Sequence, residues 1–315
     1  VCFAIYGHSA IMKHMDTLRK IIMIITRDHT ASTARETAQA LAAYGAMGFE
    51  TDLLVADRGQ AGSEKVSPQP EELLLSSGAA AYDALCIADS TDLIRILKEC
   101  GAAAAGYAHT ANRTDRLDGA EYVLSELPYI DGDSLVKIWQ RQRDLPWSIL
   151  ETERCLVREF VPGDMEAIMD LYDDRAREFL EPPSPDIDRE REILKAYIDR
   201  VYRLAGYGDW AVLLRESGEL IGRSGFSFPL RVKGLPAHDA AFGYLLGAPY
   251  RGLGIASEVC SAQLRYGFEK LGFETVIAET DNSNVSSRNL LHKLGFVPVT
   301  ENAGKRYYIC RAKIQ

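Results

Sequence analysis

The sequence predicts an α/β protein with two domains: a doubly wound parallel sheet in residues 1–148 and a mixed α/β sheet in residues 149–315. The 315 residues are enough for two domains of ordinary size. In the first half, short apolar runs alternate with helical segments at close spacing, which is typical of a doubly wound parallel sheet. In the second half, an apolar strand leads through a glycine-containing turn into an amphipathic helix, and further strands follow.

Composition and charge limit the classes of function. Hydrophobic residues make up 47% of the chain and charged residues 26%, as in ordinary globular proteins. The net charge of −9 disfavours nucleic-acid binding, because phosphate neutralisation needs a basic surface. The N-terminus lacks a long apolar run with a cleavage site, so we expect no signal peptide and no membrane span. The scattered cysteines, without a C-x-x-C pair, fit a reducing cytoplasm, and the dispersed histidines predict no metal site.

The N-terminal elements follow in order along the chain. Residues 21–26 form a continuous apolar run, as expected for a buried parallel strand. Further strands are predicted at 49–56, 84–88, 102–108 and 122–124, and helices at 31–44, 70–77, 91–100 and 133–143. Pro146 disfavours helix at Leu145, so the domain boundary is predicted near 148–151. Thr26, Asp57 and Asp89 end or follow predicted strands, where ligands bind in doubly wound sheets.

These strand ends resemble the second half of a haloacid-dehalogenase-like (HAD) phosphatase. The resemblance implies that Thr26 binds phosphate, that Lys65 is the family's loop lysine and that Asp89 binds Mg²⁺. The family's D-x-D-x-T motif is missing, because Tyr6 and His8 stand where its two aspartates would be. Neither side chain can form an aspartyl-phosphate. The domain is therefore predicted to be a catalytically degenerate HAD-like (Rossmann-like) module; the alternative is a generic α/β domain with chance aspartates at its strand ends.

The C-terminal elements are predicted from the same patterns. Strands are expected at 155–160, 210–214, 220–228, 241–246, 275–280, 297–300 and 306–311, and helices at 165–172, 189–204 and after the glycine turn. In that turn, Gly252 and Gly254 lack Cβ atoms, so the backbone can approach a ligand closely. The first amides of the following helix have no partner within the helix, so the turn suits a pyrophosphate. The alternative is that these glycines serve packing alone.

Two segments in this half resemble the GNAT N-acetyltransferase superfamily, and its RimJ/RimL branch in particular. The run R-G-L-G-I-A from Arg251 resembles the family's acyl-CoA pyrophosphate loop, and the run from Asn284 to Phe296 resembles its N-x-x-S-x-x-L-x-x-x-x-G-F segment. The resemblance covers roughly Glu151 to the C-terminus. It implies that acetyl-CoA is the cofactor and that its pantetheine arm inserts between the fourth and fifth strands. The residues predicted to bind acetyl-CoA are Tyr244, Leu245, Leu246, Arg251, Gly252, Leu253, Gly254, Ile255, Ala256, Asn284 and Ser287.

Acetyl transfer requires an amine to lose a proton and a leaving thiolate to gain one. Ser287 matches a family position near the sulfur and is a candidate proton donor; the alternative is capping of its own helix. Many relatives carry a glutamate just before the G-Y of the central strand, but Ala240–Phe242 stand there. Glu279 is the best substitute as general base, acting through a water, unless it is an exposed strand residue. Tyr250 is a further candidate for proton relay or for packing at the rim.

The predicted function is acetyl-CoA-dependent N-acetylation of a primary amine, either a protein N-terminus or a small amine. The alternative is a non-enzymatic acyl-CoA sensor, because the usual strand glutamate and the HAD nucleophile are both missing. Residual phosphatase activity in the first half is a third possibility. The sequence identifies neither the acetyl acceptor nor the oligomeric state.

Overall fold

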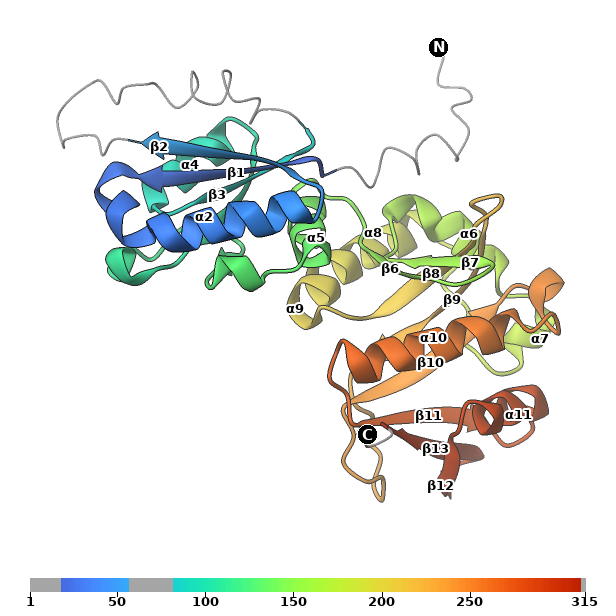
Figure 1. The fold of residues 1–315 in the computed structure, drawn as a ribbon. Helices are drawn as coiled ribbons and strands as arrows, with labels where there is room; N and C mark the ends of the chain where they lie inside the picture. Colours follow the sequence, from blue (N-terminus) through green and yellow to red (C-terminus); the bar gives the residue numbers. More distant parts are fainter. Residues whose placement is uncertain (1–17, 57–81, 313–315) are drawn as a thin grey trace, which may run out of the picture. The chain divides into compact units, whose positions relative to one another are not determined.

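The computed structural model describes residues 18–56 and 82–312 (Figure 1). The chain divides into two units, Val1–Leu145 and Pro146–Gln315. The boundary predicted near residues 148–151 falls on a strand that the sequence did not predict, β6 (Ser148–Glu151). This strand has only four residues, which is too short for a clear apolar pattern. The helix predicted at 70–77 lies outside the described residues.

The N-terminal unit contains a parallel sheet, as predicted. Its strands are β1 (Lys20–Thr26), β2 (Glu50–Ala56), β3 (Ala84–Ala88), β4 (Ala103–Tyr107) and β5 (Val123–Leu124). They lie in the order β2-β1-β3-β4-β5, and every neighbouring pair is parallel. This 2-1-3-4-5 order is that of flavodoxin-like sheets, in which ligands bind where the strand order reverses, here between β1 and β3. The HAD resemblance stays a prediction.

Helices cover both faces of this sheet (Figure 1). They are α2 (Thr30–Ala46), α4 (Thr91–Glu99) and α5 (Gly132–Gln142). Successive strand side chains point to opposite faces. In β1, Met23 therefore joins the core formed with α2 and α5, whereas Ile22 and Ile24 join the core formed with α4. Both faces of β1 are buried, which explains why its sequence is a continuous apolar run.

The C-terminal unit contains an eight-stranded mixed sheet. After β6 come β7 (Cys155–Arg158), β8 (Asp209–Leu214), β9 (Leu220–Ser227), β10 (Ala240–Leu246), β11 (Thr275–Asp281), β12 (Val297–Asn302) and β13 (Lys305–Arg311). The order is β12-β13-β11-β10-β9-β8-β7-β6. Only β10 and β11 pair in parallel; the other neighbours are antiparallel. The mixed sheet predicted for this half is confirmed.

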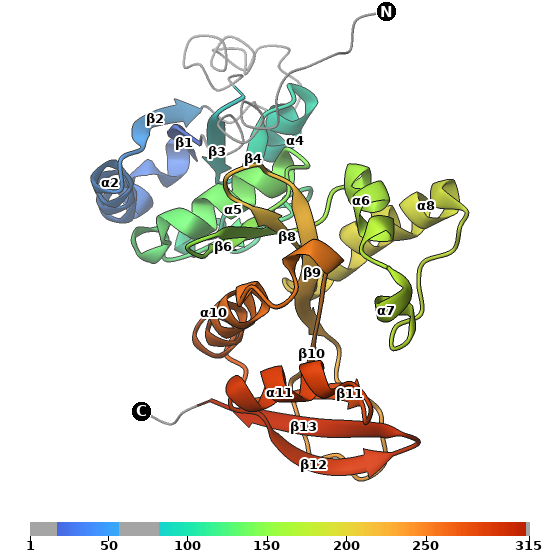
Figure 2. The same cartoon turned by 90° about the vertical axis from the view of Figure 1, so that its right-hand side faces the viewer.

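Helices flank this second sheet as well. They are α6 (Met165–Asp170), α7 (Asp174–Arg177), α8 (Ile187–Tyr197), α9 (Arg203–Ala205), α10 (Ile255–Glu269) and α11 (Val285–Lys293). Figure 2 shows α10 on one side of β9 and α6 and α8 on the other. No helix in the described ranges is long and apolar enough to cross a membrane.

The helix predicted at 189–204 is interrupted. A π-helical turn, Ile198–Tyr202, separates α8 from α9. Around this turn, Tyr197 Oη accepts a hydrogen bond from the Asp209 amide (2.7 Å), and Tyr202 Oη donates to the Asp209 carbonyl (2.6 Å). The turn thus places two tyrosines against the start of β8. Apolar periodicity carries no signal for such a local change of helical pitch.

Candidate functional site

The central feature of the C-terminal unit is the divergence of β10 and β11. The two strands pair only at their beginnings, where Ala240 faces Val276 and Ala241 faces Ile277. From Phe242 onward, β10 pairs with β9 alone. Within the described chain, the other backbone edge of Tyr244, Leu245 and Leu246 has no strand partner. This is the gap expected between the fourth and fifth strands, beside the first three predicted cofactor residues.

The bend between β10 and α10 leaves its backbone amides open. Gly252 and Gly254 have φ angles of 77° and 81°, which glycine adopts without strain. Gly254 is the N-cap of α10, and no side chain caps the helix. Among the described residues, none accepts a hydrogen bond from the amides of Gly252 to Ser257, and a Cβ on Gly252 would meet no atom within 4 Å. Unpartnered amides at a helix N-terminus attract anions, so the bend suits a phosphate group.

Arg154, near the start of the C-terminal unit, contacts this bend and the first turn of α10. Its Nη1 donates to the Leu253 carbonyl at 2.9 Å. Its guanidinium also forms an ion pair with Glu258, in the first turn of α10, at 2.6 Å. The sequence analysis missed this contact, because the two partners are about a hundred residues away and no motif links them.

The Arg251 side chain is held by an acidic residue of the same unit. Arg251 is among the residues predicted to bind acetyl-CoA, and its guanidinium pairs with both carboxylate oxygens of Asp173, at 2.8 and 2.9 Å. Its Nε also donates to the Leu246 carbonyl at 2.8 Å. The hydrogen bond from Arg251 holds the pKa of Asp173 below its ordinary value. Arg251 therefore ties the bend to β10 and to the N-terminus of α7, and only its backbone remains close to the open amides.

Asn284, Ser287 and Tyr244 lie together near the gap. The Asn284 side-chain oxygen caps α11 by accepting hydrogen bonds from the Ser287 amide (3.1 Å) and the Ser286 hydroxyl (3.0 Å). The Ser287 side chain lies beside Tyr244. Burial raises the pKa of Tyr244, and the neighbouring Ser287 side chain opposes this shift. Two hydroxyl groups therefore lie next to each other at this point, whereas Ser287 alone was predicted to protonate the leaving thiolate.

A pocket of about 490 Å³ opens beside Tyr244. Its walls come from α6, α8 and the segment around Pro183, with strands β8, β9 and β10. Most lining side chains are apolar, for example Phe160 and Leu194. A pocket of this size and composition, with a few polar groups, is typical of a small-ligand site.

The charged groups of this pocket are mainly acidic. Glu181, Glu190 and Asp209 line it, together with one cation, Arg223. Arg223 Nε lies 2.7 Å from the Asp209 carboxylate, and its Nη1 donates to the Tyr172 hydroxyl at 3.1 Å. Burial raises the pKa of Asp209, and the Arg223 charge opposes this shift. After the Asp209–Arg223 pair is counted as neutral, the lining carries a negative excess that favours a cationic ligand.

Two residues predicted to move protons lie away from this pocket. Glu279 is exposed on β11, and its carboxylate accepts a hydrogen bond from Lys305 Nζ at 2.6 Å. Tyr250 donates to the exposed Glu219 carboxylate at 2.7 Å. Neither lines the pocket. The structure therefore favours the alternatives, an exposed strand glutamate and a rim tyrosine.

The substitution Glu279→Gln is accordingly expected to change kcat less than about twofold. An exposed ion pair contributes only about 0–1 kcal/mol to stability, so the fold should also be unaffected. A general base would behave differently, because losing one typically costs about 10²–10⁴-fold in rate. Steady-state kinetics of acetyl transfer and a thermal melt of both proteins check this; a hundredfold fall in kcat would restore Glu279 as the base.

The N-terminal residues singled out from the sequence are placed only in part. Tyr6, His8, Asp57 and Lys65 lie outside the described residues. Thr26 and Asp89 do meet: the Thr26 amide and hydroxyl donate to Asp89 Oδ1 at 2.9 and 2.7 Å.

Two of the histidines, which are dispersed along the sequence, lie close together in the fold. His29 and His109 both contact the buried Asp89 carboxylate. Their positions far apart in the sequence hid this arrangement, which only the sheet topology brings about.

Comparison with known proteins identifies the second half of the chain. Residues 154–297 match the family of acetyltransferase (GNAT) domains. Uncharacterized N-acetyltransferase YoaA of Bacillus subtilis (strain 168) is 29% identical over 150 residues, which cover 47% of this chain and 82% of that protein. Uncharacterized N-acetyltransferase YnaD of the same organism is 28% identical over 151 residues, covering 46% and 81%.

Among solved structures, an acetyltransferase from Agrobacterium tumefaciens str. C58 covers 52% of this chain and 94% of its own, with 22% identity and a TM-score of 0.43. The family match spans the diverging strands, the open glycine bend and the capped Asn284 segment described above. Residues 154–297 of this chain therefore form a GNAT acetyltransferase domain.

Proposed function

We propose that the protein is an acetyl-CoA-dependent N-acetyltransferase of the RimJ/RimL type, acting on a primary amine. The observation that carries this proposal is the row of unpartnered amides from Gly252 to Ser257, beside strands that diverge after Ala241. Together they offer an anion site and, next to it, an unpaired strand edge.

The open amides are proposed to hold the pyrophosphate of acetyl-CoA. The unpaired backbone edge of Tyr244 to Leu246 would bind the amide groups of the pantetheine arm, because exposed strand edges pair readily with other amides. Asn284 Nδ2, which donates to no described residue, is a further donor for this arm. Bound acetyl-CoA supplies the thioester carbonyl that an amine attacks and the thiolate that leaves.

Tyr244, with Ser287, is proposed to protonate the leaving thiolate. Burial raises the pKa of Tyr244, so the phenol keeps its proton at neutral pH and can donate it. When the amine nitrogen bonds to the acetyl carbon, the carbon–sulfur bond breaks and the sulfur takes this proton. The ammonium form would lose one proton to solvent before the nitrogen attacks and a second proton afterwards, and one proton from solvent would restore the Tyr244 phenol. The products are then an amide, a free thiol and one released proton.

The acceptor is proposed to be a cationic amine that enters the 490 Å³ pocket. The acidic lining would attract its ammonium form, and the apolar walls would hold its carbon skeleton. A protein N-terminus and a small amine both meet this description. A cytoplasmic location is part of the proposal, since no disulfide joins the five described cysteines.

The test is an assay of the full chain with acetyl-CoA and a panel of amines and N-terminal peptides, read as release of free thiol. We expect thiol release with at least one free amine and none with the same peptide blocked by N-terminal acetylation. A thermal shift with CoA should accompany turnover. Neither thiol release nor a thermal shift would refute the proposal, whereas CoA binding without turnover on any amine would favour the sensor.

A further inference from the structure

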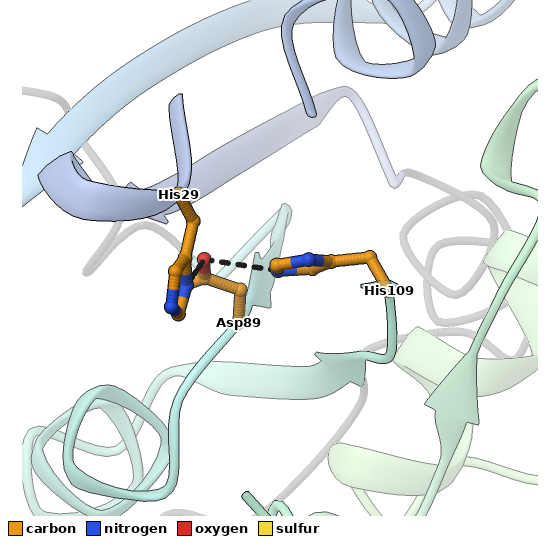
Figure 3. A group of neighbouring side chains, drawn as sticks. All are labelled: His29, Asp89 and His109. Carbon is orange, nitrogen blue, oxygen red and sulfur yellow. Dashed lines mark hydrogen bonds and ion pairs between the residues drawn. The ribbon is translucent and has the colours of Figure 1, made fainter. Parts of the chain in front are cut away.

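A cluster of two histidines and one aspartate lies at the carboxyl ends of the N-terminal sheet (Figure 3). Asp89 directly follows β3, His109 follows β4, and His29 precedes α2 after the end of β1. The strand order reverses between β1 and β3, and in such sheets ligands bind outside the strand ends at this point. The cluster therefore occupies the place where this architecture forms its binding sites.

The three side chains converge on one oxygen atom. Asp89 Oδ2 lies 2.7 Å from His29 Nδ1 and 3.2 Å from His109 Nε2. The Asp89 carboxylate is fully buried, and its other oxygen is held by Thr26. The three potential ligand atoms lie within 4.8 Å of one another.

Surrounding hydrogen bonds hold the three segments that carry these groups. Asn112 Nδ2 donates to the carbonyls of Asp89 and Tyr107, both at 2.8 Å. Its Oδ1 accepts from the His109 amide, also at 2.8 Å. On the other side, Thr33 Oγ1 donates to the His29 carbonyl at 2.9 Å. Such outer contacts orient metal ligands and strengthen their binding.

We propose that His29 Nδ1, Asp89 Oδ2 and His109 Nε2 bind a divalent transition-metal ion, with Zn²⁺ as the probe. Two imidazoles and one carboxylate are the donor set of many zinc and non-haem iron sites. Mg²⁺, which the HAD resemblance implied for Asp89, prefers oxygen ligands alone. Because two imidazoles contact this carboxylate, we expect a transition-metal ion at this site instead of Mg²⁺.

Binding requires each imidazole to present a lone pair where it now contacts Asp89. For His29, the proton moves to Nε2, which bonds to no described residue. For His109, the proton moves to Nδ1, which now accepts a hydrogen bond from the Ala111 amide at 3.2 Å. Three hydrogen bonds are lost, the two between the imidazoles and Asp89 and the one from the Ala111 amide, and three metal–ligand bonds form. Because a metal–ligand set contributes far more free energy than hydrogen bonds do, the exchange favours the bound ion.

The experiment measures Zn²⁺ binding by the full chain, as metal content after dialysis and as affinity by titration calorimetry. The test variants are His29→Asn and His109→Gln. Each substitution removes the imidazole ligand, and the new side-chain amide can still donate a hydrogen bond to Asp89. We expect the wild type to bind one equivalent of Zn²⁺ and each variant to bind it at least ~100-fold more weakly, since losing even an outer-shell partner costs about 10–100-fold.

The control is His292→Ala, because His292 is an exposed histidine of the other unit. This variant should bind Zn²⁺ as the wild type does. Circular dichroism without metal separates loss of a ligand from loss of the fold. The proposal is overturned if the wild type retains no Zn²⁺, as expected of a purely structural hydrogen-bonded triad. It is also overturned if His29→Asn and His109→Gln bind as tightly as His292→Ala.

Discussion

Gly252→Val is expected to weaken CoA binding at least ~10-fold, which corresponds to about 1.4 kcal/mol. Gly252 has a φ angle of 77°, where a β-branched residue is strained, and the open space at its Cβ position is the space proposed for the pyrophosphate. A valine there would both fill this space and disturb the row of amides. Titration of CoA into both proteins, followed by fluorescence or calorimetry, measures the change.

Gly272→Val is the matched control for this experiment. Gly272 has nearly the same φ angle, 72°, and a Cβ on it would also meet no atom within 4 Å. It follows the C-terminal end of α10, whereas Gly252 precedes the N-terminal end. Both variants should lose about 1–2 kcal/mol of stability from backbone strain. Equal CoA affinities in the two variants would contradict the proposed pyrophosphate site.

Tyr244→Phe is expected to lower kcat about 10²-fold while leaving CoA affinity nearly unchanged. The substitution removes only the hydroxyl that is proposed to protonate the thiolate, and positioned acids contribute about 10²–10⁴-fold. Single-turnover measurements with saturating acetyl-CoA isolate this step from product release. Ser287→Ala, which removes the hydroxyl beside Tyr244, should give a smaller loss.

Tyr250→Phe is the control for the tyrosine, because its hydroxyl donates to the exposed Glu219 and Tyr250 does not line the pocket. It should keep the wild-type rate. The pH dependence adds a second readout. The protonated phenol is the active form and is lost as pH rises through its pKa, which burial raises above the ordinary value near 10. The wild-type rate should therefore not fall between pH 7 and about 9, and a full rate in Tyr244→Phe would exclude this role.

Local signals in the sequence predicted most of the fold and the glycine bend before α10. The apolar run of β1 is buried on both faces, so its pattern needs no knowledge of distant residues. The local backbone conformation likewise requires glycine at Gly252 and Gly254, because both residues adopt positive φ angles directly before a helix. Such features depend on neighbouring residues and can be predicted from them.

Contacts between distant segments were beyond prediction from the sequence. The residues around Arg251 in the sequence do not show that its guanidinium pairs with Asp173 in the fold. The position of Glu279 in the sequence made it a candidate for the general base. In the structure, its carboxylate forms an ion pair with Lys305 on the neighbouring strand. In both cases a charged side chain finds an opposite charge that is remote in sequence, and no periodic pattern records this pairing.

A crystal structure of the full chain with CoA tests the central claim most directly. The account predicts that pyrophosphate oxygens lie within about 2.7–3.2 Å of amide nitrogens between Gly252 and Ser257. It also predicts that the CoA sulfur lies beside Tyr244 and Ser287, between β10 and β11. A pyrophosphate bound elsewhere, with these amides facing only solvent, would contradict it.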